Sequence, residues 1–298
     1  MRLAAIDIGS NAARLLISDV IPGTQAAPEF LKIALIRVPL RLGFDVFDKG
    51  EISATKANNV IKTIQSYKLL LDVYGVKHLR ACATSAMRDA SNGKEIIKKV
   101  KAETGIDIKI ISGQEEASFI YENHFADGLT RDESYLYIDV GGGSTELTFF
   151  SDGKLIFKES FNIGTIRLLK NQVSEATWDE MKEFIKAKTK GYHHVSAIGT
   201  GGNINKVFSI SKRKEGKPLS LELLRDYYKE FSILSLEQRM SLYKFREDRA
   251  DVIVPALLIY INVMRWADAQ EIFVPKIGLA DGLIHSLYEE IKLTGVEA

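Results

Sequence analysis

The residues best suited to chemistry lie in the segment Tyr137–Leu147, with the sequence YIDVGGGSTEL. An apolar strand carrying Asp139 leads into three glycines and two hydroxyl residues, and Glu146 follows them. Glycines permit positive φ angles that would bring backbone N–H groups to an oxyanion, and the hydroxyls add donors. Carboxylates do not bind phosphate themselves, so Asp139 and Glu146 suit a hard metal ion or an attacking water. A plain glycine-rich turn between two strands is the alternative.

A second copy of this pattern lies near the N-terminus. The segments AAIDIGSNAARLLI and LYIDVGGGSTELTF share an apolar strand, an aspartate, one apolar residue, a turn containing glycine and hydroxyl residues, and a second strand. Their aspartates, Asp7 and Asp139, are 132 positions apart, about half of the 298 residues. A repeat of this period predicts two similar domains that face one another. Two unrelated β-turns are the alternative.

Strand-to-helix junctions supply further candidate anion ligands. A predicted strand at His78–Ala83 runs into ATSAMRDASN, where Thr84, Ser85 and Arg88 stand at the start of a helix. Backbone N–H groups at such a junction, with a guanidinium beside them, suit phosphate oxygens. An ordinary helix cap is the alternative.

The second half of the sequence contains two more turns of this kind. Gly164 and Thr165 turn the chain and leave Arg167 directed at an anion, and a predicted strand at Val195–Ile198 feeds the glycine-rich turn Gly199–Asn203. The latter suits a second phosphate or a nucleotide ribose. A simple loop between strand and helix is the alternative.

The elements between these motifs alternate between strand and helix, which is typical of an α/β fold. Periodicity predicts a helix at Ser53–Tyr74, a strand at Ile106–Ile111 and a helix beginning at Ser112. Glu115 and Glu116 fall in the first turn of that last helix, where acidic side chains commonly complement the helix dipole.

Composition favours a two-domain globular protein. Hydrophobic residues are 46% and charged residues 27%, and cores tend to split beyond about 250–300 residues. The net charge of +1 gives no reason to expect a nucleic-acid duplex or a membrane as partner. The longest uncharged run, Val252–Met264, is shorter than the roughly 20 residues of a membrane span, so we expect a buried helix. The single cysteine, Cys82, and the lack of a signal-peptide pattern predict a cytoplasmic protein.

Several mechanisms are excluded by missing motifs. The sequence has no GxxxxGK[ST] loop, no HExxH or paired zinc spacing and no GxSxG elbow. Phosphate-type turns in both halves, with carboxylates beside them, instead suit phosphoryl transfer, which needs mainly positioning and charge neutralisation. If the attacking group is water, the protein is a phosphohydrolase.

Seven motifs in order carry a family resemblance. They are IDIGSN, ATSAMRDASN, ISGQEEA, IDVGGGSTEL, IGTIRL, IGTGGN and RADVIVPA. Together they resemble the exopolyphosphatase/guanosine pentaphosphate phosphohydrolase (Ppx/GppA) family of the actin, Hsp70 and sugar-kinase superfamily, in a short two-domain form. The resemblance implies an α/β fold of two ribonuclease H-like domains facing across a cleft. Residues 1–126 would form the first domain, with a C-terminal helix at 283–298 packing back on it, and residues 127–282 the second.

The resemblance also implies an activity. Family members remove the terminal phosphate of inorganic polyphosphate, or the 5′-γ-phosphate of pppGpp in the stringent response, with Mg²⁺ or another divalent cation. Glu116 of ISGQEEA would activate the attacking water, and Glu146 would assist it or hold the metal, with Asp139 and Asp7 as further metal ligands. The residues expected to bind the phosphate chain are Ser10, Asn11, Arg14, Ser85, Arg88, Gly141, Gly142, Gly143, Ser144, Thr145 and Arg167.

Two departures from the family pattern keep other functions open. The chain stops before the C-terminal helical portion of longer members, which favours short chains or a nucleotide as substrate over long polymers. The GLADG segment at Gly278–Gly282 has Ala280 where the family has an arginine. A sensor that binds guanosine polyphosphate or polyphosphate without turnover is therefore an alternative, and a superfamily kinase is another. The sequence leaves open the substrate, the chain length, the metal and the formation of a homodimer.

Overall fold

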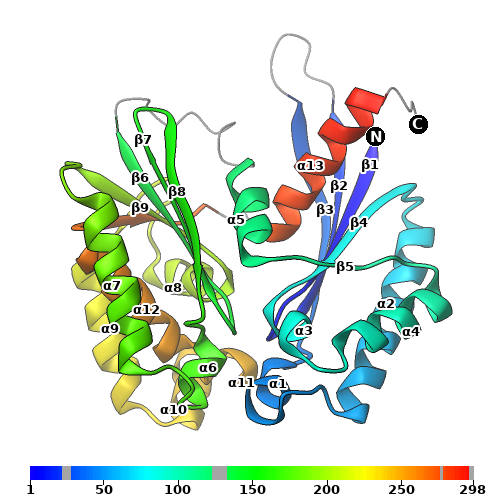
Figure 1. The fold of residues 1–298 in the computed structure, drawn as a ribbon, viewed down its shortest axis with the longest axis horizontal. Helices are drawn as coiled ribbons and strands as arrows, with labels where there is room; N and C mark the ends of the chain where they lie inside the picture. The colour runs from blue at the N-terminus through cyan, green and yellow to red at the C-terminus, as the bar shows by residue number, and fades with distance from the viewer. Residues whose placement is uncertain (22–27, 123–132, 276–277, 295–298) are drawn as a thin grey trace. The chain divides into compact units, whose positions relative to one another are not determined.

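The computed structural model describes residues 1–21, 28–122, 133–275 and 278–294. Contacts divide the chain into two compact units, each with its own sheet (Figure 1). Unit 1 comprises Met1–Gly128 and Gly278–Ala298, and unit 2 comprises Leu129–Ile277. The domain limit predicted at residues 126–127 lies outside the described residues, as does the end of the helix predicted at 283–298.

Unit 1 is built on a five-stranded mixed sheet. Its strands are β1 (Arg2–Ile8), β2 (Ala13–Ile21), β3 (Glu29–Val38), β4 (His78–Ala83) and β5 (Lys109–Ile110), in the order β3-β2-β1-β4-β5. β1 pairs antiparallel with β2 and parallel with β4. Because successive side chains point to opposite faces of a sheet, Asp7 shares a face with Leu3 and Ala5. It stands at the C-terminal end of β1, beside Cys82 of β4.

Helices cover both faces of this sheet (Figure 1). They are α1 (Gly43–Lys49), α2 (Ala54–Val73), α3 (Ser85–Asp89), α4 (Gly93–Thr104), α5 (Gly113–Glu122) and α13 (Leu279–Thr294). The Tyr67 hydroxyl of α2 donates a hydrogen bond to the Ala13 carbonyl at 3.1 Å. The final helix, α13, packs on the face that contains Leu3. Gly282 lets α13 approach α5, because a Cβ there would lie 1.9 Å from the Phe119 carbonyl oxygen.

A six-stranded mixed sheet forms the centre of unit 2. Its strands are β6 (Ser134–Val140), β7 (Thr145–Ser151), β8 (Lys154–Phe161), β9 (Val195–Thr200), β10 (Leu219–Ser220) and β11 (Glu271–Phe273), in the order β10-β11-β9-β6-β7-β8. β6 pairs antiparallel with β7 and parallel with β9, as β1 does with β2 and β4. The run β8-β7-β6-β9 therefore repeats the order β3-β2-β1-β4. This shared topology confirms the repeat inferred from the two aspartate-containing motifs.

The helices of unit 2 follow local sequence signals. They are α6 (Thr165–Leu169), α7 (Glu175–Thr189), α8 (Gly202–Ser211), α9 (Leu221–Ile233), α10 (Leu236–Tyr243), α11 (Glu247–Ala250) and α12 (Ile253–Trp266). The side chains of Ser174, Ser220 and Ser235 accept hydrogen bonds from first-turn N–H groups and so begin α7, α9 and α10. The buried helix predicted from the uncharged run is α12, which packs in one core with Leu136 and Ile138 of β6.

One predicted strand is much shorter in the structure than the sequence pattern indicated. The apolar pattern at 106–111 forms a strand only at Lys109–Ile110, where it pairs with the last two residues of β4. Ile106, Ile108 and Ile111 are nevertheless buried. The alternation of apolar residues therefore reported burial correctly, but burial does not by itself produce strand pairing.

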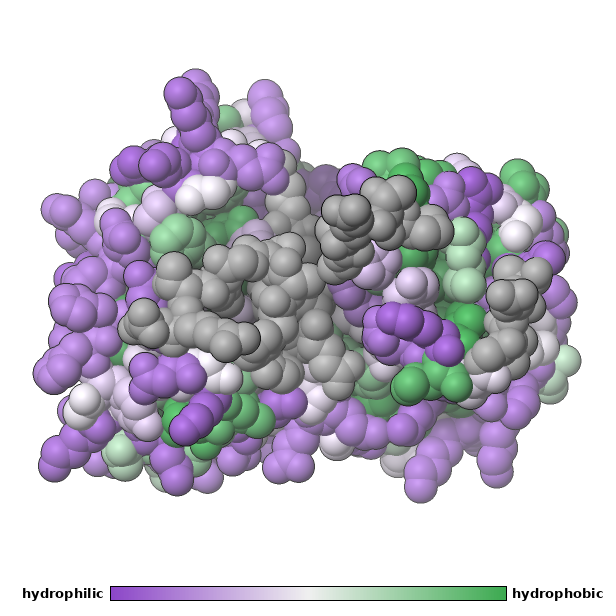
Figure 2. All heavy atoms as spheres, turned by 90° about the horizontal axis from the view of Figure 1, so that it is seen from above, coloured by the Kyte–Doolittle hydropathy of each residue, from purple (hydrophilic) through white to green (hydrophobic). Residues whose placement is uncertain are grey.

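The surface is mainly polar on the face drawn in Figure 2, where hydrophobic side chains appear in small separate groups between hydrophilic ones. No helix among the described residues is long and apolar enough to cross a membrane.

Candidate active site

Two carboxylates face each other at the end of the β6–β7 hairpin. Asp139 of β6 and Glu146 of β7 are directly opposed in the antiparallel register, so both side chains project to the same face of the sheet. A carboxylate oxygen of Asp139 lies within 4.8 Å of one of Glu146. The Ser160 hydroxyl of β8 donates a hydrogen bond to Glu146 at 3.0 Å, and Glu146 is only 3% exposed.

The equivalent position in unit 1 has a neutral pair. Asp7 of β1 is directly opposed to Arg14 of β2, and the Arg14 Nη1 to Asp7 Oδ2 distance is 2.7 Å. Asp7 is only 2% exposed, and its ion pair with Arg14 balances its negative charge within unit 1. The two repeats therefore place an ion pair in unit 1 where unit 2 has two like charges. Two carboxylates with oxygens within 4.8 Å of each other, as in Asp139 and Glu146, favour a bound cation or a shared proton.

The glycine turn after Asp139 depends on close packing. The expectation of positive φ is wrong here, since Gly141–Gly143 are not among the described glycines with that conformation. The turn instead packs against the start of α6. The Thr165 and Ile166 N–H groups donate hydrogen bonds to the Gly141 and Gly142 carbonyls at 3.0 and 2.8 Å. A Cβ on Gly164 would lie 2.4 Å from the Gly142 carbonyl oxygen. Glycine at 164 is therefore required by space.

Replacing Gly164 by alanine tests this packing. We expect Gly164→Ala to lower the free energy of unfolding by about 1–3 kcal/mol, the usual effect of forcing extra volume into a packed site, and to disturb the turn that precedes Glu146. Urea denaturation measures the loss. Gly278→Ala is the control, because a Cβ there meets no atom of the described residues within 4 Å. Equal stability of the two variants would contradict the packing explanation.

Side chains around the turn also hold its backbone. The Thr145 hydroxyl donates to the Ile163 carbonyl at 2.6 Å, and Arg167 Nε donates to the Gly143 carbonyl at 2.7 Å. Ser144 is buried at the same turn. The structure thus places Ser144, Thr145 and Arg167 together with the glycines, as their sequence positions predicted, and gives Thr145 and Arg167 a structural role as well.

The phosphate-binding candidates of unit 1 gather at the ends of β1 and β4. The Ser10 and Ser85 hydroxyls share a hydrogen bond of 2.8 Å, and the Asn11 carbonyl accepts one from the Arg41 N–H. Arg88 is turned toward the chain entering α5, where its Nη1 donates to the Ile111 carbonyl at 2.9 Å. Their binding of phosphate stays a prediction.

The two adjacent glutamates of α5, Glu115 and Glu116, have different surroundings in the structure. Glu115 forms a capping box with Ser112, in which each side chain accepts the other residue's backbone N–H. Its bond to Lys109, 2.7 Å long, and the Ser112 N–H lower the pKa of Glu115 to about 2. Glu116 is buried instead. Burial raises the pKa of the Cys82 thiol, and the carboxylates of Asp7 and Glu116 raise it further.

The Glu115 cap has a measurable pH dependence. Because the folded pKa of Glu115 is below its unfolded value of 4.5, its contribution is present above pH 4.5 and is lost as the pH falls toward 2. We expect Glu115→Gln to destabilise the protein by about 0.2–1 kcal/mol at pH 7, since solvent screens this exposed pair. Urea denaturation at pH 7 and pH 2.5 should show the difference shrinking. A difference that grows in acid would contradict this assignment.

Three further residues border the site in unit 2. Gly201, at φ 98°, begins α8, and a Cβ there would lie 2.9 Å from Asp139 Oδ1. Arg249 donates a hydrogen bond to the Asn203 side chain, and its guanidinium covers Gly202. The Tyr260 hydroxyl donates to the Thr200 carbonyl, and burial together with nearby Asp139 raises its pKa. Arg249 was assigned no role from the sequence, although its place in the RADVIVPA motif was a usable signal.

These features define a class of protein. Two α/β units share the order of four strands, and each carries an aspartate-bearing strand and a tight turn at the same point of its sheet. The sequence matches the Ppx/GppA phosphatase family over residues 24–291. The chain therefore belongs to the Ppx/GppA phosphatase family.

Individual relatives agree with this assignment. The chain is 30% identical to exopolyphosphatase 1 of Mycobacterium tuberculosis over 56% of its own length and 48% of the relative's. It is 23% identical to the guanosine-5′-triphosphate,3′-diphosphate pyrophosphatase of Vibrio parahaemolyticus, over 99% of its own length and 61% of the relative's. The chain thus spans about half the length of these curated relatives. The crystal structure of an exopolyphosphatase from Cytophaga hutchinsonii shares the fold, with a TM-score of 0.82, 24% identity and coverage of 100% and 99% of the two chains.

Proposed function

We propose that this protein is a phosphohydrolase that releases the terminal phosphate of inorganic polyphosphate or the 5′-γ-phosphate of pppGpp. The observation that carries the proposal is the pair of opposed carboxylates at the glycine turn, the half-buried Asp139 and the buried Glu146. The names of two relatives, an exopolyphosphatase and a guanosine-5′-triphosphate,3′-diphosphate pyrophosphatase, support these two substrates.

Asp139 and Glu146 are the residues we assign to a divalent cation, Mg²⁺ or another. Their oxygen atoms are the ligands that hard cations prefer, and two like charges within 4.8 Å fit an ion of opposite charge. When bound, such an ion neutralises the negative charge of the phosphate oxygens. Asp7 is less suited to this role than the sequence implied, because Arg14 already balances its charge.

Glu116 is the residue we assign to the attacking water. Its carboxylate accepts a proton from the water as the oxygen attacks phosphorus, and it orients that water in line with the bond that breaks. Glu115 is not equivalent, because Ser112 and Lys109 occupy its carboxylate. The turn at Gly141–Gly143 and the paired hydroxyls of Ser10 and Ser85 would hold phosphate oxygens by hydrogen bonds.

A direct assay tests the proposal. Phosphate release is measured from tripolyphosphate, long-chain polyphosphate and pppGpp, with Mg²⁺ and after its removal by EDTA. We expect release from at least one substrate in Mg²⁺ and little in EDTA. Tight binding of ppGpp or polyphosphate by calorimetry, without any release from the three substrates, would overturn the proposal and favour a sensor.

A further inference from the structure

Four side chains form a row across the sheet of unit 2 at the end of β6. Asp139 is directly paired with Glu146 of β7 and with Thr200 of β9, and Glu146 is in turn paired with Ser160 of β8. Directly paired residues share a face of the sheet, and neighbouring strands are about 4.8 Å apart. A Cβ on Gly201 would lie 2.9 Å from Asp139 Oδ1, so the Asp139 carboxylate lies beside the end of β9. This carboxylate row therefore has a hydroxyl residue at each end.

The two hydroxyls of the carboxylate row differ in their partners. The Ser160 hydroxyl donates a hydrogen bond to Glu146 at 3.0 Å. Thr200 is 0% exposed, and among the described residues its Oγ1 has no hydrogen-bond partner. A buried hydroxyl without a partner costs free energy that a bound ligand can recover. Thr200 therefore suits a ligand that binds at the carboxylate row.

The same four positions of unit 1 hold a different set of side chains. In its equivalent strands, β4, β1, β2 and β3, the row consists of Cys82, Asp7, Arg14 and Arg37. Two guanidinium groups accompany one carboxylate there. The row of unit 2 has two carboxylates and contains neither arginine nor lysine. A bound cation would balance its charge, and hydroxyl groups suit the oxygen atoms that surround a hard cation.

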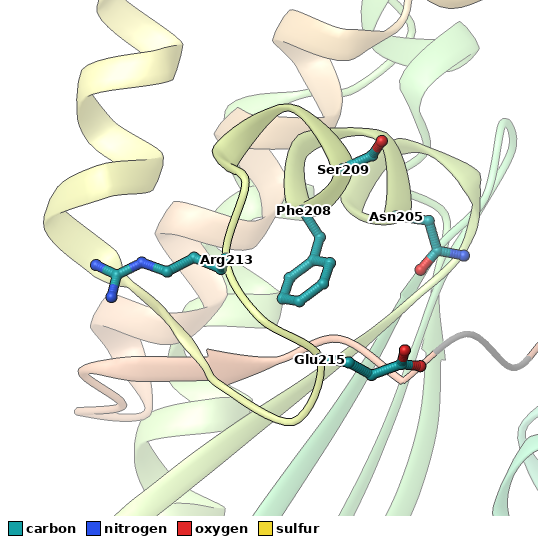
Figure 3. Close-up of a pocket in the computed structure, with 5 residues that line it drawn as sticks. All are labelled: Asn205, Phe208, Ser209, Arg213 and Glu215. Atoms are coloured by element: carbon teal, nitrogen blue, oxygen red, sulfur yellow. The ribbon is translucent and has the colours of Figure 1, made fainter.

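A cavity beside α8 does not provide the partner of Thr200. The cavity has a volume of about 310 Å³, and its described lining residues are Asn205, Phe208, Ser209, Arg213 and Glu215. Figure 3 shows these side chains on α8 and on the segment that follows it. Thr200 precedes α8 and is not among them. The carboxylate row is therefore the site at which a ligand would meet the Thr200 hydroxyl.

We propose that Thr200 is a positioning residue of the cation site, and that its hydroxyl donates a hydrogen bond to a water molecule in the hydration shell of the cation. The inference rests on the proposed function and deepens it, because it adds an outer residue to the site assigned to Asp139 and Glu146. Asp139 lies between Thr200 and Glu146 in the row, so Thr200 is assigned to the water and not to the ion. Mg²⁺ usually keeps several waters, and outer residues that orient the ligands of a metal strengthen its binding.

Binding of Mn²⁺, which prefers the same oxygen ligands as Mg²⁺, tests this role without turnover. Electron paramagnetic resonance measures free Mn²⁺ during titration of the wild type and of the variants Thr200→Val, Thr200→Ser and Thr189→Val. We expect Thr200→Val to bind Mn²⁺ about ten-fold or more weakly, and Thr200→Ser, which keeps the hydroxyl, to bind it like the wild type. Thr189→Val is the control and should also bind like the wild type. It makes the same change at a buried threonine of α7, whose hydroxyl donates to the Ile185 carbonyl.

Melting of the metal-free proteins distinguishes this role from a purely structural one. Valine has nearly the shape of threonine, and the loss of a buried hydroxyl that lacks a partner should leave stability unchanged or raise it. We therefore expect metal-free Thr200→Val to melt at or above the wild-type temperature, and Thr189→Val to melt below it because it loses a hydrogen bond. Wild-type Mn²⁺ affinity in Thr200→Val, or an equal loss of affinity in Thr200→Val and Thr200→Ser, overturns the role of Thr200.

Kinetics separate this inference from the proposed function. We expect Thr200→Val to raise the Mg²⁺ concentration for half-maximal phosphate release about ten-fold or more, with kcat at saturating Mg²⁺ close to the wild-type value. Phosphate release with an unchanged Mg²⁺ dependence in Thr200→Val overturns the role of Thr200 and leaves the phosphohydrolase standing. Weaker Mn²⁺ binding by Thr200→Val, without phosphate release by any of the proteins, supports that role and overturns the activity. A wild-type protein that binds no Mn²⁺ overturns the cation site and this inference together.

Discussion

We expect Glu116→Gln to lower kcat for phosphate release by about 10²–10⁴-fold, the usual contribution of a positioned general base. Glutamine keeps the size of the side chain and an acceptor oxygen, but it cannot take a proton from water. Steady-state kinetics in Mg²⁺ measure the change, and KM should stay close to the wild-type value because the groups assigned to phosphate are intact.

The neighbouring glutamate provides a matched control. Glu115→Gln makes the same chemical change in the same helical turn, at a side chain bound to Ser112 and Lys109. We expect its kcat to stay within about two-fold of the wild type, as for most surface substitutions. Full activity of Glu116→Gln, or an equal loss in both variants, would remove Glu116 from the proposed role.

The second large effect concerns the opposed carboxylates. We expect Asp139→Asn to raise the Mg²⁺ concentration needed for half-maximal activity by about 10²–10³-fold, because one charge–charge contact of about 4 Å near a protein surface contributes about 4 kcal/mol. The thermal stability of the metal-free protein should increase, although the substitution weakens Mg²⁺ binding. Without metal, the variant should melt at a higher temperature than the wild type, since the repulsion between Asp139 and Glu146 is removed.

Thermal melting with and without Mg²⁺ separates a metal ligand from a merely structural residue. The wild type should gain stability on adding Mg²⁺, and Asp139→Asn should gain much less. Glu159→Gln is the control: Glu159 is next to Ser160 on β8, on the opposite face from Glu146. A Mg²⁺ response in Asp139→Asn equal to that of the wild type would contradict the assignment.

Local patterns predicted much of the fold. The apolar runs before Asp7 and Asp139 predicted the two strands, and the matching motifs predicted the repeat that the strand orders confirm. Ser53 and Ser112 marked helix starts because a cap acts within one turn. The seven motifs also indicated the correct family. The catalytic and ligand roles of Glu116, Glu146 and the phosphate-binding residues stay predictions.

By itself the sequence determined the elements, their repeat and the family, because these follow from periodicity, caps and motifs that act over a few residues. Only the tertiary structure decided that Arg14 neutralises Asp7 while Glu146 opposes Asp139. It also decided that Glu115 caps a helix and Glu116 does not, and that Gly164 is required by space. The physical reason is that charge balance and steric room depend on strand register and on contacts between residues distant in the sequence.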